Sequence, residues 1–395
     1  YLTIMILKQT TGFLSHLPIT QPITHDKERI FFAILNGQIT TRREAVKLLN
    51  IRSTTVSEYV AQLLDSRLLT ETISQNSGRG RPSMVLVVNP NRLITLVFQV
   101  ISLSLHVFAI NLVSNVIAHE QLEASPDCDN QALADKFSQL HEKIMVKIPK
   151  SAEVAGCVFS LGGIFDSQTY HWIHASRWPR MNNLNIKKLF PENYRVVLSR
   201  TLDDELMLHV LERNRSTLLL HWGYGVGVAF STADNQINVG GHGFGEIGHW
   251  HIPQQIKPCQ CGQVGCLETV AALWSIGPDV LGNKFKAHDD EENIAEILAS
   301  CDLASNPVMQ QAIIHMVNAA SNICRVFFPS RLIVSGPFVK NPQVWATFCE
   351  NFQQQNAFFG QTLPELSMSQ INRNSRIYGA ALPVLEQTLL ELLAQ

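Results

Sequence analysis

One histidine and three cysteines between residues 249 and 266 constrain the fold of this chain more than any other feature. His249, Cys259, Cys261 and Cys266 follow the spacing H-x9-C-x-C-x4-C. Three thiolates and one imidazole are a full ligand set for a tetrahedral zinc ion with no open position. Two glycines in the cysteine segment let the chain turn tightly enough for the sulfurs to converge. Unrelated cysteines beside a core histidine are the alternative, but a glycine-framed C-x-C-x4-C is rarely accidental. We therefore predict a structural zinc site.

The residues around this cluster resemble a known family. They read E-x-G-H from Glu246 to His249 and C-x-C-G-x-x-G-C-L-E from Cys259 to Glu268. Both patterns are typical of the ROK family (repressors, open reading frames, kinases), and the chain resembles its Mlc/NagC/XylR-type repressors. The similarity extends over nearly the whole chain, as far as Gly379–Leu382. It implies two actin-like, ribonuclease-H-like α/β lobes with a cleft between them.

Residues 25–89 have the pattern of a winged helix-turn-helix. Apolar side chains recur with helical spacing in residues 26–36, and a capping box at Thr41–Glu44 opens a second helix. Ser53 is the expected N-cap of a third helix. Two strand-like runs follow it and flank a segment rich in glycine and arginine, which would be the wing.

The wing and the third helix are the expected DNA contacts. In G-R-G-R-P the two arginines alternate with glycines, so an extended backbone could place both guanidinium groups in a narrow A·T-rich minor groove. A solvated hairpin tip is the alternative. Small hydroxyl residues at the start of the third helix can approach phosphates and base edges closely, and nearby arginines would attract the phosphates. The net charge of the chain is −2, yet residues 25–88 carry nine Lys and Arg against six Asp and Glu. The expected DNA-binding residues are Arg42, Arg43, Arg52, Ser53, Thr54, Thr55, Ser57, Arg79 and Arg81.

We expect four units along the chain. Residues 1–24 would be an N-terminal arm, and 25–89 the DNA-binding domain. Residues 90–200, completed by the C-terminal helix 376–395, would form the first lobe, and 201–375 the second lobe with the zinc site. Strand-rich openings followed by helices favour two α/β lobes. At 395 residues, of which 46% are hydrophobic and 16% charged, the chain can form two or three packed domains.

A cytoplasmic location is expected. The stretch Leu93–Ala118 contains no Asp, Glu, Lys or Arg and is long enough to span a bilayer. Polar residues interrupt it, however, so we predict consecutive buried strands. The apolar N-terminal residues lack a basic start and a cleavage site, and do not read as a signal peptide. Eight cysteines without a signal peptide favour a reducing compartment.

The motifs that make family members sugar kinases are altered in this chain. The kinase D-x-G-G-T segment corresponds to Gln99–Leu103, where bulky side chains would block the backbone from nucleotide phosphates. The kinase N-D pair corresponds to Arg200 and Thr201, and a threonine hydroxyl cannot be a general base near neutral pH. The glycine-rich loop 223–227 and the Gly336 turn are retained. Two losses outweigh them, so we expect no catalysis and no ATP.

The resemblance assigns sugar-hydroxyl contacts to Glu246, His249 and Glu268, all of which are present. Arg200 would enter the same pocket, where it could clash with a sugar, pair with one of the two glutamates, or bind a phosphorylated ligand. Alternatively, the carboxylates now serve only the fold.

These features together predict a DNA-binding transcriptional regulator, a repressor of genes for sugar uptake or metabolism. It would bind a palindromic double-stranded DNA operator as a homodimer or tetramer. Its effector would be a sugar, a phosphosugar, or the glucose transporter of the phosphotransferase system. A ROK sugar kinase with a DNA-binding arm is the competing class, and a DNA-binding protein without any effector is a third.

Overall fold

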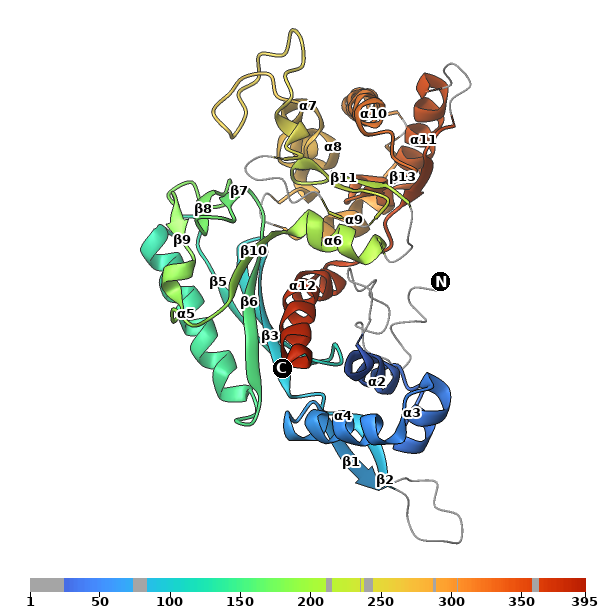
Figure 1. Cartoon of the computed structure of the whole chain (residues 1–395). Coiled ribbons are helices and arrows are strands. Elements are labelled where there is room, and N and C mark those ends of the chain that lie inside the picture. Colours follow the sequence, from blue (N-terminus) through green and yellow to red (C-terminus); the bar gives the residue numbers. More distant parts are fainter. Residues whose placement is uncertain are drawn as a thin grey trace.

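The N-terminal part consists of three short helices and a two-stranded sheet (Figure 1). The computed structural model describes residues 25–73, 84–210, 215–234, 236–237, 244–286, 289–303, 305–356 and 362–395. The N-terminal elements are α2 (Asp26–Leu35), α3 (Arg42–Leu49), α4 (Ser53–Asp65), β1 (Leu69–Ile73) and β2 (Met84–Val88). The two strands pair antiparallel, and the expected helices and strands of this region are confirmed.

The ends of these helices follow local rules with one exception. The capping box of α3 is present: Glu44 N donates to Thr41 Oγ1 at 3.2 Å, and Thr41 N donates to Glu44 Oε2 at 3.1 Å. Asn50 ends the helix in the left-handed region at φ 54°. The expected N-cap of α4 was wrong, because Arg52 is the cap and Ser53 is the first helical residue. Ser53 therefore does not cap the helix. It lies exposed in the first turn of α4.

A five-stranded sheet follows, with the strand order β10-β6-β3-β4-β5. Strands β3, β4 and β5 form an antiparallel meander, β6 pairs parallel with β3, and β10 pairs parallel with β6. The strands are β3 (Leu93–Ile101), β4 (Ser104–Asn111), β5 (Val116–Glu123), β6 (Glu153–Leu161) and β10 (Val196–Arg200). A smaller sheet of β7 (Ile164–Asp166), β8 (His171–His174) and β9 (Leu184–Asn185) lies beside it.

Helices cover both faces of this sheet, which explains why β3 is mostly apolar on both sides. Ile94, Leu96 and Phe98 belong to the apolar cluster under α5 (Asn130–Lys147). Leu93 and Val97 belong to the cluster under α12 (Arg373–Ala394), and Figure 1 shows the two helices on opposite sides. The α12 cluster also contains the apolar residues of the N-terminal helices, so one continuous core joins the two parts.

The stretch 93–118 thus forms β3, β4 and the start of β5, as expected. Within the described residues, α12 alone is long and apolar enough to cross a membrane. Half of its most apolar window is buried inside the protein, as in the core helix of a globular domain.

The second large sheet has four strands in the order β12-β11-β13-β14. Its helices are divided between two faces: Leu218 and Leu220 face a core with α8, α10 and α11, whereas Leu219 faces α6. The strands are β11 (Thr217–Trp222), β12 (Val226–Ser231), β13 (Arg331–Ser335) and β14 (Glu365–Met368). The helices are α6 (Thr201–His209), α7 (Glu268–Ala271), α8 (Leu273–Leu281), α9 (Glu291–Ala299), α10 (Pro307–Phe327) and α11 (Pro342–Asn356). Short 3-10 helices are η2 (Lys187–Leu189), η3 (Ile247–His249), η4 (Gly282–Lys284) and η5 (Phe338–Lys340).

Candidate functional site

The four expected metal ligands form one cluster. The ligand atoms of His249, Cys259, Cys261 and Cys266 all lie within 4.8 Å of one another. The distance from Cys259 Sγ to His249 Nδ1 is 3.7 Å, and so is the distance from Cys261 Sγ to Cys266 Sγ. A tetrahedron with Zn–S bonds of about 2.3 Å has S···S edges of about 3.8 Å. The cluster can therefore hold a metal ion, and its spacing fits zinc.

Two glycines shape the loop that carries the cysteines. Gly262 and Gly265 have φ values of +89° and +75°, which side-chain-bearing residues rarely adopt. A Cβ atom on Gly265 would lie 2.5 Å from the carbonyl oxygen of Gln255. The glycines thus close the loop that brings the last three ligands to one point.

The expected sugar-contact residues line a cavity of about 330 Å³ next to this cluster. Glu246, His249 and Glu268 all face it, so these residues lie together as expected. His249 belongs to both features: its Nδ1 faces Cys259 and its Nε2 lies 3.8 Å from Glu246 Oε2. A metal ion on Nδ1 would therefore fix the ring that borders the cavity.

The two cavity glutamates differ in their environment. Glu268 Oε1 accepts from the backbone N of Val226 at 3.0 Å, and its Oε2 accepts from Trp274 Nε1 at 3.1 Å. Burial raises the pKa of Glu246, while His249 and Arg200 act to lower it. Glu268 is thus held by the protein, and Glu246 is the carboxylate better placed to accept from a ligand hydroxyl.

Arg200 lines this cavity, but its guanidinium pairs with neither Glu246 nor Glu268. Its Nε and Nη2 donate to the two carboxylate oxygens of Asp203 at 2.8 and 2.6 Å. Its Nη1 donates to the carbonyl oxygens of Phe244 and Val228. The expected pairing of Arg200 with Glu246 or Glu268 is thus wrong, because Asp203, three residues along α6, satisfies the guanidinium bidentately. Arg200 instead fixes the backbone directly before Glu246.

A second cavity of about 540 Å³ lies beside the first. The altered kinase segment Gln99–Ser102 and the Gly336 turn both line it, and Thr201 lines both cavities. Gln99 is 2% exposed, and its Oε1 has no hydrogen-bond partner among the described residues. The two cavities therefore occupy the place where the ends of the two large sheets meet.

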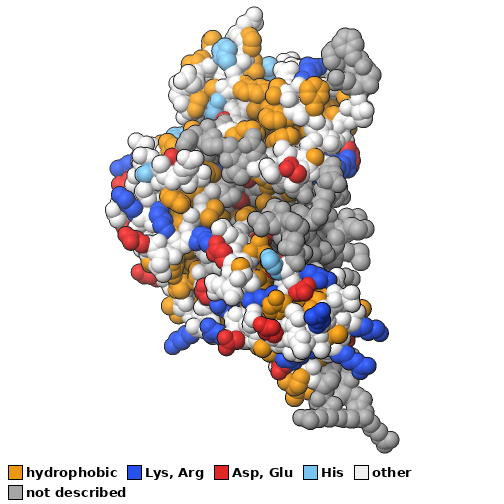
Figure 2. All heavy atoms as spheres, in the orientation of Figure 1, with side chains coloured by type: hydrophobic (Ala, Val, Ile, Leu, Met, Phe, Trp, Pro, Cys, Tyr) orange, Lys and Arg blue, Asp and Glu red, His pale blue; other side chains and the backbone are white. Residues whose placement is uncertain are grey.

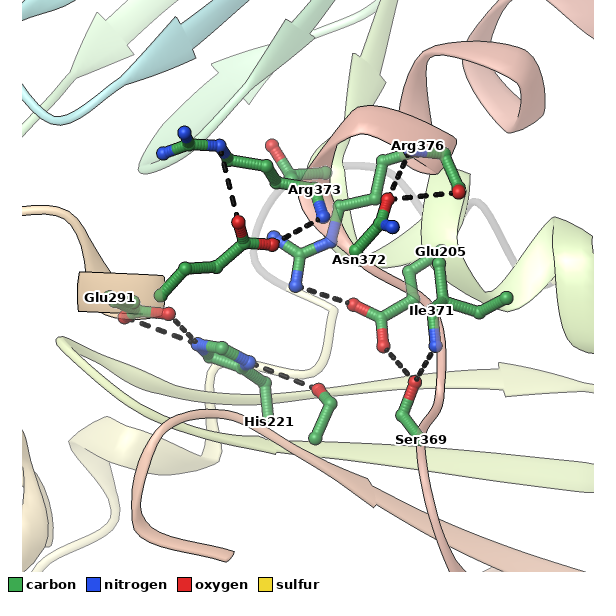
Figure 3. A network of polar contacts seen from close by, with 12 residues as sticks. Glu205, His221, Glu291, Ser369, Ile371, Asn372, Arg373 and Arg376 are labelled. Carbon is green, nitrogen blue, oxygen red and sulfur yellow. Dashed lines mark hydrogen bonds and ion pairs between the residues drawn. The ribbon is translucent and has the colours of Figure 1, made fainter. Parts of the chain in front are cut away.

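Sequence reasoning missed a polar network at this junction (Figure 3). Arg376 of α12 pairs with Glu205 of α6 at 2.8 Å, and Ser369 Oγ donates to the other oxygen of Glu205 at 2.7 Å. Arg373 pairs with Asp290 next to α9, and its backbone N donates to Glu292 at 2.9 Å. The acidic run at 289–292 was the available signal, but its partners lie more than 80 residues away.

The environment of Asp204 predicts that the stability of the folded protein depends on pH. Asp204 is buried on α6, and its carboxylate accepts from Ser160 Oγ at 2.5 Å and from Ser199 Oγ. Burial raises its pKa to about 7 despite these donors. Because the folded pKa exceeds the unfolded value of about 3.9, its stabilising effect is present below about pH 4 and is lost as pH rises through about 7.

We expect Asp204→Asn, which cannot titrate, to remove this trend. Between pH 4 and 7 the free energy of unfolding of the natural chain should fall relative to the variant, by at most ~1.4 kcal/mol per pH unit. Urea unfolding of both proteins at several pH values measures the difference. Parallel pH profiles would contradict the assignment.

The N-terminal unit presents most of the expected DNA contacts at its surface. Figure 2 shows Lys and Arg side chains over the end of the molecule that carries α3 and α4 in Figure 1. Arg42 forms an ion pair with Glu71 at 2.5 Å, and Thr55 is half-buried. Arg79 and Arg81 lie outside the described residues. The exposed members of the set are Arg43, Arg52, Ser53, Thr54 and Ser57.

Two helix-covered sheets with a cavity of carboxylates between them, beside a Cys3His cluster, define a sugar-kinase-like α/β protein. The chain belongs to the ROK family, whose model matches residues 104–387. The xylose repressor of Caldicellulosiruptor bescii is 24% identical over 335 residues, which cover 78% of this chain and 82% of the repressor.

Solved structures show the same fold. A ROK family transcriptional regulator, homolog of the E. coli Mlc protein, matches 97% of this chain and 100% of its own, with a TM-score of 0.67 and 20% identity. The ROK hexokinase from Thermus thermophilus matches 73% of this chain and 97% of its own, with a TM-score of 0.56 and 18% identity. The kinase match leaves more than a quarter of this chain uncovered, and the regulator match leaves almost none.

Proposed function

We propose that this chain is a DNA-binding transcriptional regulator, a repressor of genes for sugar uptake or metabolism. The observation that carries the proposal is the N-terminal unit. Helices α3 and α4 are separated by the short segment 50–52, and an antiparallel strand pair follows them. Arg52, Ser53, Thr54 and Ser57 are exposed at the start of α4. These features support a winged helix-turn-helix, whose second helix would enter the major groove.

The proposed units are those expected from the sequence: an arm at 1–24, a DNA-binding domain at 25–89, a first lobe at 90–200 with 376–395, and a second lobe at 201–375. Residues of α12 and of the N-terminal helices belong to one apolar cluster. A change in the angle between the lobes can therefore reach the DNA-binding domain through packed side chains. In a homodimer or tetramer on a palindromic operator, such a change would alter the spacing of the two recognition helices.

The proposed effector site is the first cavity. Its volume is at the lower end of small-molecule pockets, about 300–1,000 Å³, and Glu246 and Glu268 supply acceptors for hydroxyl groups. A sugar or phosphosugar is the proposed ligand class, with capture by the phosphotransferase-system glucose transporter as the alternative effector. Since Asp203 satisfies Arg200, that residue is not proposed to bind a ligand phosphate. A structural zinc ion on the Cys3His cluster would hold His249 against this cavity, in a protein of the cytoplasm.

A kinase is the competing function, and the site predicts its absence. Thr201 stands where the family's general base is expected, and its hydroxyl cannot take a proton from a sugar near pH 7. We expect no sugar-dependent release of ADP from ATP with hexoses, pentoses or amino sugars, measured by a coupled assay. Sugar-dependent turnover at rates typical of kinases, ~1–100 s⁻¹, would contradict the proposal.

The proposed function is tested by fluorescence anisotropy of full-length protein on an A·T-rich palindromic duplex, titrated with sugars, sugar phosphates and the transporter's cytoplasmic domain. Release by a small molecule, weakened at least ~10-fold by Glu246→Gln, supports the first cavity as effector site. Release of the DNA by the transporter domain alone would indicate that the effector binds to the outer surface and not in the cavity. Absence of any DNA binding would overturn the proposal.

A further inference from the structure

The glycine-rich loop between β11 and β12 offers backbone N–H groups of the kind that bind anions. Two of these groups are already used by carboxylates of the chain. Tyr224 N donates to Glu291 Oε1, and Val226 N donates to Glu268 Oε1 at 3.0 Å. The loop lines the first cavity, and Glu291 lines both cavities, so a dissolved anion can approach the same place.

Glu291 lies among positive and hydrogen-bonding groups. His221 Nε2 is 3.2 Å from its Oε2, and His221 Nδ1 is held by Ser335 Oγ at 3.1 Å (Figure 3). Arg177 lines both cavities; its guanidinium lies 4.2 Å from the ring centre of Tyr224 and donates to Ser102 Oγ at 3.3 Å. Burial acts to raise the pKa of Glu291, but His221, the Tyr224 amide and Arg376 outweigh it and lower the pKa to about 2. Glu291 is therefore ionised at neutral pH.

The close approach of the carboxylates accounts for the glycines of the loop. A Cβ atom on Gly223 would overlap the Glu291 carboxylate and His221. A Cβ atom on Gly225 would lie 2.9 Å from Glu268 Oε1. The glycines retained from a phosphate-binding loop thus make room here for oxygen atoms of the chain itself.

Glu291 is also held in place by its neighbours. Asp290 caps α9 by accepting from Glu292 N at 2.7 Å, and both acidic side chains bind Arg373 at the start of α12. These contacts fix the start of α9. Glu291 is therefore held next to the loop, where it competes with dissolved anions as an intramolecular ligand at high effective concentration.

We propose that the loop 223–226 is an oxyanion-binding site that the chain fills with its own Glu291, which excludes nucleotide phosphates from the loop. This inference rests on the proposed loss of kinase function and gives it a physical cause that is separate from the missing general base. It predicts that removal of one carboxylate uncovers the binding of a phosphate-type anion.

The test is calorimetric titration of the full-length protein with pyrophosphate. We expect Glu291→Ala to bind pyrophosphate ~10- to 100-fold more tightly than the natural chain, the range for one charge-assisted hydrogen bond. Glu296→Ala is the matched control, because it removes an exposed carboxylate further along α9 that contacts neither the loop nor Arg373 in the described part of the chain. An unchanged affinity in a folded Glu291→Ala protein, or an equal gain in Glu296→Ala, would overturn the proposal.

A second measurement covers the case in which Glu291→Ala does not fold. Glu291→Gln keeps the shape of the side chain and removes its charge, so hydrogen exchange at the Tyr224 amide should accelerate, whereas Glu296→Gln should leave it unchanged. Equal exchange rates in the natural chain and Glu291→Gln would overturn the proposal. Neither measurement involves DNA, so their failure would leave the DNA-binding function standing.

Discussion

Replacing Cys259 with alanine is expected to abolish tight zinc binding and to weaken operator binding by at least ~10-fold, although no DNA contact is changed. The binding free energy of structural zinc in zinc-finger peptides is about 10–16 kcal/mol, and it is also folding free energy. The cluster includes His249 at one end, and Glu268 lies two residues after Cys266 at the other. Loss of the metal should therefore disorder the wall of the first cavity and the lobe that carries it.

Metal content by mass spectrometry and operator affinity by anisotropy measure the two effects. Cys349→Ala is the matched control: this half-buried cysteine of α11 lies outside the cluster, and its loss should change neither zinc content nor affinity. Unchanged zinc and unchanged affinity in Cys259→Ala would contradict the structural role of the cluster.

Arg52→Ala is expected to lower operator affinity by about 1–3 kcal/mol and to reduce the slope of log affinity against log salt by about one. Arg52 is exposed at the N-cap position of α4, where its side chain makes no capping hydrogen bond, and it makes no ion pair in the described residues. Its guanidinium is thus available to a phosphate. Arg42→Ala should have a smaller effect, because Glu71 already neutralises Arg42 at 2.5 Å.

Arg325→Ala is the control for these variants, since it removes the same charge at the far end of α10. Anisotropy titrations at several salt concentrations give the slope for each protein. An unchanged slope in Arg52→Ala, or an equal loss in Arg325→Ala, would contradict the placement of α4 on DNA.

Features with short-range causes were predictable from the sequence. The capping box of α3 involves neighbouring residues, and the buried strands from Leu93 onward follow from a stretch without charges that polar residues interrupt. The Cys3His cluster was predictable because metal-ligand spacing is a local constraint on a glycine-rich loop.

Features that depend on long-range packing were not predictable. Arg200 lines the first cavity as expected, but its partner is Asp203, which the start of α6 places on the same side. The ion pairs of Arg373 and the contact of Glu291 with the loop join segments that only the folded chain brings together. A pattern of acidic residues identifies their charge but not the donor that each carboxylate meets.

The central claim is that this chain recognises a specific DNA sequence under the control of a sugar-type effector. Selection of bound duplexes from a random library by the full-length protein, repeated with sugars and sugar phosphates, tests it most directly. We expect enrichment of one two-fold symmetric sequence with an A·T-rich part, and loss of that enrichment in the presence of one effector. A library that stays random after selection would contradict this function.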